Sequence, residues 1–143
     1  MRGVTSDDDL HAMAAKLNIR LNGVYFKNEL PRIPHEGNYI INMASSDDGS
    51  GGTHWTCVRL EDNGALYFDP FGIPEPRAVN DFMMKWVHND TKKIIRNQRD
   101  VQNISSNWCG QWCIACLSTL EFAPGSLQQR LNDFLESFRD YSR

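Results

Sequence analysis

Apolar residues recur at helical spacing in four parts of the chain and predict four helices. The first helix is expected to follow Ser6, whose hydroxyl can cap it, and to carry three aspartates at its positive end. Pro124 and Gly125 separate the last two helices. The predicted helices are Ser6–Leu17, a segment after Pro74–Pro76 with Val79, Phe82, Met83, Trp86 and Val87 on one face, Cys109–Phe122, and Ser126–Phe138.

Short apolar runs between turn-forming residues predict the strands. Two of them meet at Glu61-Asp62-Asn63-Gly64, and Asn-Gly is the strongest short-range signal for a β-hairpin. The Val24–Phe26 segment is too short to assign. The predicted strands are Asn38–Met43, Trp55–Leu60, Ala65–Phe68 and a short strand at Ile94–Ile95. Helices and strands arranged around a central hairpin indicate an α+β domain.

Composition and charge limit the class of protein. A length of 143 residues is typical of one domain, expected to cover residues 1–143, and 41% hydrophobic with 23% charged residues is ordinary for a soluble protein. A net charge of -3 disfavours a nucleic acid as the main partner. Lys92, Lys93, Arg96 and Arg99 form either a local basic patch or a solvated strand edge. The acidic start of the chain has no signal-peptide core and no apolar run matches a membrane span, so we expect a protein that is soluble and intracellular, or packaged from an intracellular compartment, without a membrane partner. We also expect a monomer.

The four cysteines are unevenly spaced, with three in one segment, which is unlike the framework of a secreted disulfide-bonded domain. A reducing compartment is therefore expected. Cys113 and Cys116 form a CxxC pair, but zinc requires two more ligands and the chain offers no second pair of suitable spacing. Helical spacing places both thiols on one inward stripe with Cys109, Leu117 and Leu120. We interpret them as packing residues and expect neither a metal nor a cofactor.

The hairpin gives His54 and Asp69 a physical reason to meet. Both lie near its open end, on one face and two to four residues apart along the strands. Asp69 can then accept a hydrogen bond from one ring nitrogen and leave the other free to take a proton. Each residue alone is more often structural, Asp69 as a turn residue before proline, so their conjunction carries the hypothesis.

Cys109 completes a candidate catalytic centre. It stands where irregular chain gives way to a helix, and the helix dipole and a nearby imidazolium both favour the thiolate. Gly110 leaves room for a substrate backbone, and Gln102 can donate its amide to the oxyanion that the Cys109 N–H also stabilises. Trp55 is either a core residue or a wall of the substrate groove, and both interpretations stay open. A base, an acid, an amide donor and a thiol in this order indicate a cysteine hydrolase.

These residues also resemble a known family. The segments that carry the resemblance are His54-Trp55, Phe68-Asp69-Pro70-Phe71-Gly72, Gln102 and Cys109-Gly110. They look like the adenovirus-type maturation protease and its relatives in large DNA viruses, virophages and polinton-like elements. More distantly, they are similar to proteases that process SUMO and other ubiquitin-like proteins. The resemblance implies a papain-like or adenain-like α+β fold in which a central helix bearing the nucleophile packs on a mixed, largely antiparallel sheet.

The resemblance also implies roles for individual residues: Cys109 as the nucleophile, His54 as general base and later acid, Asp69 as the orienting acid, Gln102 as the oxyanion donor, and Trp55 with Gly110 beside a narrow substrate groove. The family's substrates are capsid and core precursor proteins cut after small residues, often glycine. We therefore expect a cysteine endopeptidase that processes such precursors in the infected cell and is packaged in the virion, not secreted. A deconjugating protease for ubiquitin-like modifiers and a metal-binding interaction module are the alternatives. The adenovirus-type enzyme is activated by DNA and by a peptide that it binds through a disulfide. This chain is acidic and has no cysteine just before Gln102, so neither form of activation is expected.

Overall fold

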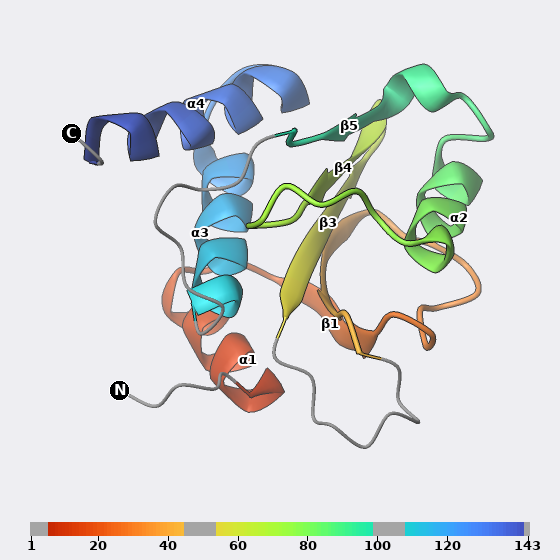
Figure 1. Ribbon diagram of the computed structural model, residues 1–143, viewed down its shortest axis with the longest axis horizontal. Helices are drawn as coiled ribbons and strands as arrows, with labels where there is room; N and C mark the ends of the chain where they lie inside the picture. Colours follow the sequence, from red (N-terminus) through yellow and green to blue (C-terminus); the bar gives the residue numbers. More distant parts are fainter. Residues whose placement is uncertain (1–5, 45–53, 99–107, 142–143) are drawn as a thin grey trace.

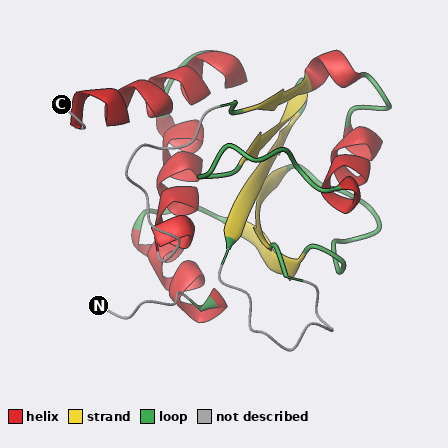
Figure 2. Ribbon diagram, viewed as in Figure 1, coloured by secondary structure: helices red, strands yellow, loops and turns green. Residues whose placement is uncertain are grey.

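The computed structural model describes residues 6–44, 54–98 and 108–141 and shows a five-stranded sheet with helices on both faces (Figure 1). Helices α1, α3 and α4 cover one face and α2 covers the other (Figure 2). The predicted α+β class is confirmed. The elements in chain order are α1 (Asp7–Lys16), β1 (Leu21–Phe26), β2 (Gly37–Asn42), β3 (Trp55–Glu61), β4 (Gly64–Phe68), α2 (Arg77–Trp86), a 3-10 turn (Thr91–Lys93), β5 (Ile94–Arg96), α3 (Cys109–Phe122) and α4 (Leu127–Tyr141).

The sheet is mixed and its order follows the chain, β1-β2-β3-β4-β5. The inner pairs β2–β3 and β3–β4 are antiparallel, and the outer pairs β1–β2 and β4–β5 are parallel. Glu61 faces Gly64 across a two-residue turn, so the predicted hairpin is confirmed. Helix α3 packs on β3, which places the helix that begins with Cys109 on the middle of the sheet, as predicted.

The predicted helices are present with small differences at their ends. Helix α3 has the predicted bounds, whereas α4 continues to Tyr141. Ser6 Oγ accepts the Asp9 N–H at 3.1 Å and the Asp9 carboxylate accepts the Ser6 N–H at 3.0 Å, a reciprocal cap. Leu17 was expected on the apolar face, but α1 ends one residue earlier and the Leu17 side chain is 45% exposed. Strand β1 occupies the segment that the pattern left unassigned.

Side chains of β3 and β4 alternate between two cores. Cys57 and Phe68 belong to the core under α1, α3 and α4. Val58 and Tyr67 belong to the core under α2. The inward stripe predicted for α3 is buried along its whole length; its members are Cys109, Cys113, Cys116, Leu117 and Leu120.

An ion-pair network ties the turn end of the hairpin to the last two helices. Arg130 of α4, itself 8% exposed, donates to the two carboxylate oxygens of Glu61 at 2.7 and 2.8 Å. Arg59 also donates to Glu61 and, at 2.9 Å, to Glu121 of α3. Burial raises the pKa of Glu61, but hydrogen bonds from Arg130 and Arg59 outweigh it and hold that pKa below its ordinary value. The Glu61 carboxylate is therefore charged at neutral pH.

We expect Glu61→Ala to lower the free energy of unfolding by about 2 kcal/mol or more, because it leaves the buried Arg130 guanidinium without its carboxylate. The measurement is urea denaturation with an unchanged m value. Glu61 has a lowered pKa when folded, so its contribution is present above its unfolded pKa and is lost as the pH falls through the folded value. Glu29→Ala, at an exposed position, is the control, and equal losses in both variants would contradict the role of the network.

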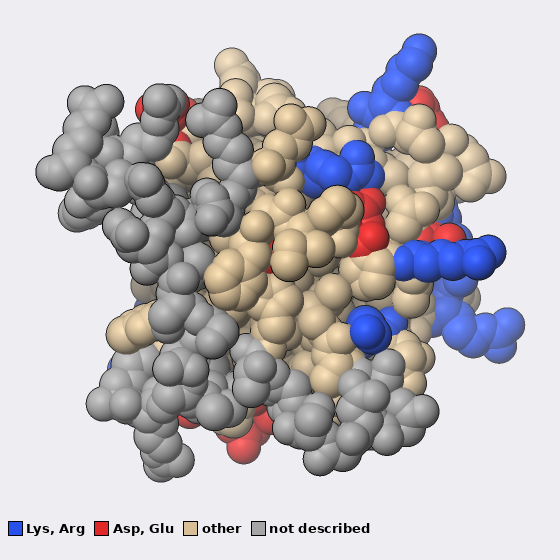
Figure 3. Space-filling view, viewed as in Figure 1, with Lys and Arg blue, Asp and Glu red and all other residues tan. Residues whose placement is uncertain are grey.

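Charged side chains are distributed over the surface. On the face that Figure 3 shows, basic and acidic side chains of the described residues lie next to one another, without a continuous basic area. Arg96 donates to Glu75 at 2.6 and 2.9 Å, and Lys92 and Lys93 lie in the exposed 3-10 turn. Arg99 lies outside the described residues. Within the described ranges, no helix combines the length and apolar character that a membrane crossing requires.

Candidate active site

His54 lies between Asp69 and Cys109 and contacts both. Its Nδ1 is 3.2 Å from Cys109 Sγ, and its Nε2 is 2.9 Å from Asp69 Oδ1. The thiol, the imidazole and the carboxylate thus form a continuous line, although Cys109 is 55 residues from His54 in sequence. The structure therefore brings together three residues that the sequence analysis singled out.

The register of the hairpin explains the contact between base and acid. Cys57 pairs with Phe68, so the same register places Asp69 opposite Thr56, two residues beyond His54 and within the predicted offset. His54 precedes the first residue of β3, and strand alternation does not dictate where its ring points. Its carbonyl accepts the Met43 N–H at 2.9 Å, which keeps its backbone attached beside β2.

The hydrogen bonds assign a task to each ring nitrogen. Nε2 donates to the Asp69 carboxylate, so Nδ1 is the atom that exchanges a proton with Cys109. Burial lowers the His54 pKa, but hydrogen bonds to Asp69 and Cys109 and the charges of both outweigh it and raise the pKa to about 9. An imidazolium beside the sulfur favours the thiolate, the nucleophilic form of a cysteine.

Asp69 is 1% exposed and is held by its own turn. Its Oδ1 accepts the Phe71 N–H at 2.8 Å in addition to the His54 contact, and its carbonyl accepts the Gly72 N–H at 2.8 Å. Among the described residues, Oδ2 is buried without a hydrogen-bond partner. The centroids of the Phe71 and His54 rings are 5.0 Å apart, and the angle between the ring planes is 30°. Phe71 therefore supports both members of the pair, with its backbone on the acid and its ring on the base.

Cys109 is the first residue of α3, at the helix end whose first backbone N–H groups have no acceptor within the helix itself. The N-cap residue Trp108 provides no side-chain hydrogen bond to them. Both Cys109 and Gly110 are buried, whereas the His54 side chain is 23% exposed. Of the two groups that would exchange the proton, the His54 ring is therefore the more accessible.

The other thiols lie in the core. Cys57, Cys113 and Cys116 are fully buried, and Cys113 Sγ donates to the Trp55 carbonyl at 3.4 Å. Burial raises the pKa of the Cys113 and Cys116 thiols well above the ordinary value, which keeps them protonated. Within the ranges 6–44, 54–98 and 108–141, no three His, Cys, Asp or Glu side chains are grouped to hold a metal ion. The environment of Cys113 and Cys116 is that of packing residues.

Two further residues were predicted to belong to the site, Trp55 and Gln102. Trp55 is 5% exposed and belongs to the core cluster of α1, α3 and α4, which fits the core interpretation offered above. Gln102, predicted to donate to the oxyanion, lies outside the described residues.

Sequence reasoning missed two residues that contact the acid, Phe71 and Asn97. The Asp-Pro-Phe-Gly turn was a signal for the first, because an aspartate side chain often accepts a backbone N–H two residues on. Asn97 contacts the Asp69 backbone from 28 residues away, just beyond β5. Nothing in the local sequence marks that contact.

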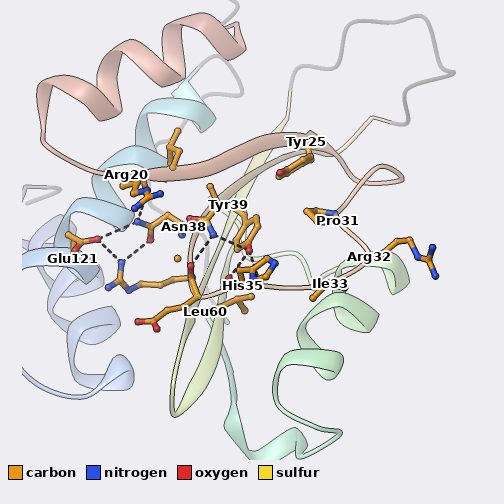
Figure 4. A pocket seen from close by; sticks show the side chains of 15 residues that line it. Arg20, Tyr25, Pro31, Arg32, Ile33, His35, Asn38, Tyr39, Leu60 and Glu121 are labelled. Carbon is orange, nitrogen blue, oxygen red and sulfur yellow. Dashed lines mark hydrogen bonds and ion pairs between the residues drawn. The ribbon is translucent and has the colours of Figure 1, made fainter.

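A hollow lies at the end of the sheet away from His54. It has a volume of about 990 Å³ and is lined by β1, the loop before β2, β3 and the end of α3 (Figure 4). Its polar groups largely bond to one another: Asn38 bonds to Glu121 at 3.3 Å and accepts from Arg59 at 2.8 Å, while the Tyr39 hydroxyl donates to the His35 carbonyl at 2.6 Å. Neither His54, Asp69 nor Cys109 lines it.

No protein-family model and no curated protein matches this chain. Among solved structures, the ASFV pS273R protease is similar with a TM-score of 0.42 and 18% sequence identity, over 71% of this chain and 42% of that one. HopZ1a, solved in complex with IP6, is similar with a TM-score of 0.45 and 13% identity, over 93% of this chain and 47% of that one. The chain spans less than half the length of either. Similarity at this level assigns neither a family nor an activity to this chain.

Proposed function

We propose that this chain is a cysteine endopeptidase. The observation that carries the proposal is the line of contacts from Cys109 Sγ through His54 to Asp69 Oδ1, at 3.2 and 2.9 Å. A thiol with a base, and a third group that orients that base, is the arrangement that nucleophilic catalysis requires. The position of Cys109 at a helix N-terminus adds backbone donors where negative charge would develop.

In the proposed reaction the Cys109 thiolate attacks a peptide carbonyl, forming a C–S bond and an oxyanion. The oxyanion collapses, His54 Nδ1 gives its proton to the amine, and the C–N bond breaks. A water molecule then loses a proton to the same nitrogen and attacks the thioester, and the C–S bond breaks to release the acid. Asp69 keeps the ring oriented through Nε2 in both halves. Gln102 is proposed to stabilise the oxyanion.

We further propose that the substrates are viral capsid or core precursors cut at glycine-rich sites, during maturation in the infected cell and the particle. This rests on the resemblance of the segments around His54, Asp69 and Cys109 to the adenovirus-type proteases. Gly110 supports it, because a nucleophile followed by glycine leaves room for a substrate main chain. Hydrolysis of a ubiquitin-like conjugate instead of a precursor would identify the deconjugating alternative.

The test uses electrophilic probes of two sizes, iodoacetamide and a peptide that carries a thiol-reactive group after Gly-Gly. We expect both to label Cys109 at pH 7 faster than the three core thiols, because Cys109 contacts the imidazole of His54, which is 23% exposed and favours the reactive thiolate. Mass spectrometry of the digested protein locates the label. His54→Ala is the matched variant, and its rate of labelling at Cys109 should fall because the neighbouring imidazolium is lost. Equal labelling of all four cysteines, or none at Cys109, would overturn the proposal.

A further inference from the structure

Asp69 lies just beyond the end of its strand, so the sheet does not fix its backbone. Strand β4 ends at Phe68 and β5 ends at Arg96. The last described pair of their parallel ladder is Tyr67 with Arg96. A residue past the end of a ladder depends on other groups to hold its N–H and C=O, and at Asp69 the turn supplies one of them, the Gly72 N–H on the C=O at 2.8 Å. The carboxylate that orients the proposed base is carried by such a residue.

The side chain of Asn97 takes over from the ladder at this point. Its Oδ1 accepts the Asp69 N–H at 3.0 Å and its Nδ2 donates to the Asp69 carbonyl at 2.7 Å. The two bonds fix which amide atom is which, because a backbone N–H only donates and a carbonyl only accepts. A primary amide thus binds both the N–H and the C=O of one residue, as the opposite residue does in an antiparallel hydrogen-bonded pair. Asn97 is 6% exposed, so water competes little with these bonds.

The carboxylate itself is held on one side. Oδ1 is shared by the Phe71 N–H and His54 Nε2, whereas Oδ2 has no hydrogen-bond partner among the described residues. A rotation of the Asp69 backbone would therefore meet little resistance at Oδ2 and would carry Oδ1 away from the imidazole. The two bonds from Asn97 oppose that rotation.

We infer that Asn97 is a positioning residue, which holds the Asp69 backbone so that its carboxylate faces His54; this inference rests on the proposed function. The two described bonds of Asn97 go to the backbone of Asp69, so its proposed action is through Asp69. Its effect is therefore expected in kcat and in the pH dependence of the base, with little effect on KM. Among the described residues, Asp69 and Cys109 are the titratable groups that act on the His54 ring.

Asn97→Ala removes both bonds. We expect kcat to fall roughly 10- to 100-fold, because a small displacement of an orienting group is costly in catalysis. We also expect the alkaline limb of the pH profile to move to lower pH, since the Asp69 hydrogen bond raises the pKa of His54. In an Asp69→Asn background the same substitution should change kcat less than roughly threefold, because the two residues act as one unit. A full additional loss in that background would overturn the inference.

Asn97→Asp keeps the shape of the side chain and tests the inference even if the alanine variant does not fold. A protonated carboxyl at this position can accept from the Asp69 N–H and donate to its carbonyl, whereas the ionised form cannot donate. Activity relative to the native protein should therefore fall as the pH rises and the new carboxyl ionises. A ratio that is constant with pH would contradict the inference.

Asn38 provides the matched control. It is 2% exposed and uses both amide atoms in hydrogen bonds, but it lies at the other end of the sheet. Asn38→Ala should lose stability without moving the pH profile. NMR titration of the His54 ring measures the effect of Asn97 on the His54 pKa without a substrate. It therefore distinguishes the positioning role of Asn97 from the proposed protease function. If the native protein cleaves nothing, the protease proposal fails, while an unchanged His54 titration in the Asn97 variants refutes the positioning role alone.

Discussion

Cys109→Ala is expected to abolish peptide cleavage while the fold is retained. Removal of the nucleophile of a catalytic triad commonly costs on the order of 10⁴-fold or more in kcat. Alanine at this buried position deletes one sulfur atom, so the loss of stability should stay near about 1 kcal/mol. The measurements are kcat/KM on a Gly-Gly peptide and on a precursor protein, with circular dichroism and urea denaturation for the fold.

Cys116→Ala is the matched control for that loss. Cys116 lies on the same face of α3, is equally buried, and contacts neither His54 nor Asp69 in the described part of the site. It should lower stability by a similar amount and leave kcat/KM near the native value. Cys113→Ser should also be tolerated far better than a change at Cys109. Undiminished cleavage by Cys109→Ala, or equal loss in all three variants, would refute the assignment of the nucleophile.

Asp69→Asn is expected to lower kcat/KM roughly 10³- to 10⁴-fold and to shift its dependence on pH. His54 has a pKa raised to about 9, so it keeps its proton, and can protonate the departing amine, at pH values below about 9. The hydrogen bond and the charge of Asp69 contribute to that rise. Their removal lowers the His54 pKa, and the alkaline loss of activity should therefore begin at lower pH.

The experiment compares pH profiles of kcat/KM with the NMR titration of the His54 ring. Asp62→Asn makes the same chemical change at the exposed turn of the same hairpin and should leave both curves in place. A His54 titration that stays near pH 9 in Asp69→Asn would show that the carboxylate does not set the protonation of the base. Activity of that variant close to the native value would remove Asp69 from the mechanism.

Most elements of the fold could be predicted because their local patterns are strong. The apolar face of α2, the Ser6 cap of α1 and the Asn63-Gly64 turn each depend on residues within one short segment. Strand β1 was not assigned because it is an edge strand whose side chains are mostly half-buried, without the alternation that marks one buried face. Its parallel pairing with β2 depends on contacts that local sequence does not encode.

The predictable part of the site was likewise the local part. His54 and Asp69 share one hairpin, so turn chemistry and strand periodicity were enough to place them together. Asn97 was missed because its contacts with Asp69 require the parallel pairing of β4 with β5. The burial of Cys109 was predictable for the same reason as the hairpin, because helical spacing within α3 places it on the inward stripe.

The hairpin that joins β3 and β4 also has a consequence for the order of assembly. It brings His54 and Asp69 together over 15 residues, whereas the contact of His54 with Cys109 closes 55 residues. Short loops close at a lower entropic cost, and a chain that is being synthesised exposes its earlier segments first. The base and its acid can therefore pair while the thiol is still to be made. The proposed thiolate–imidazolium pair then forms only when α3 docks, so an unfinished chain on the ribosome lacks the proposed catalytic centre.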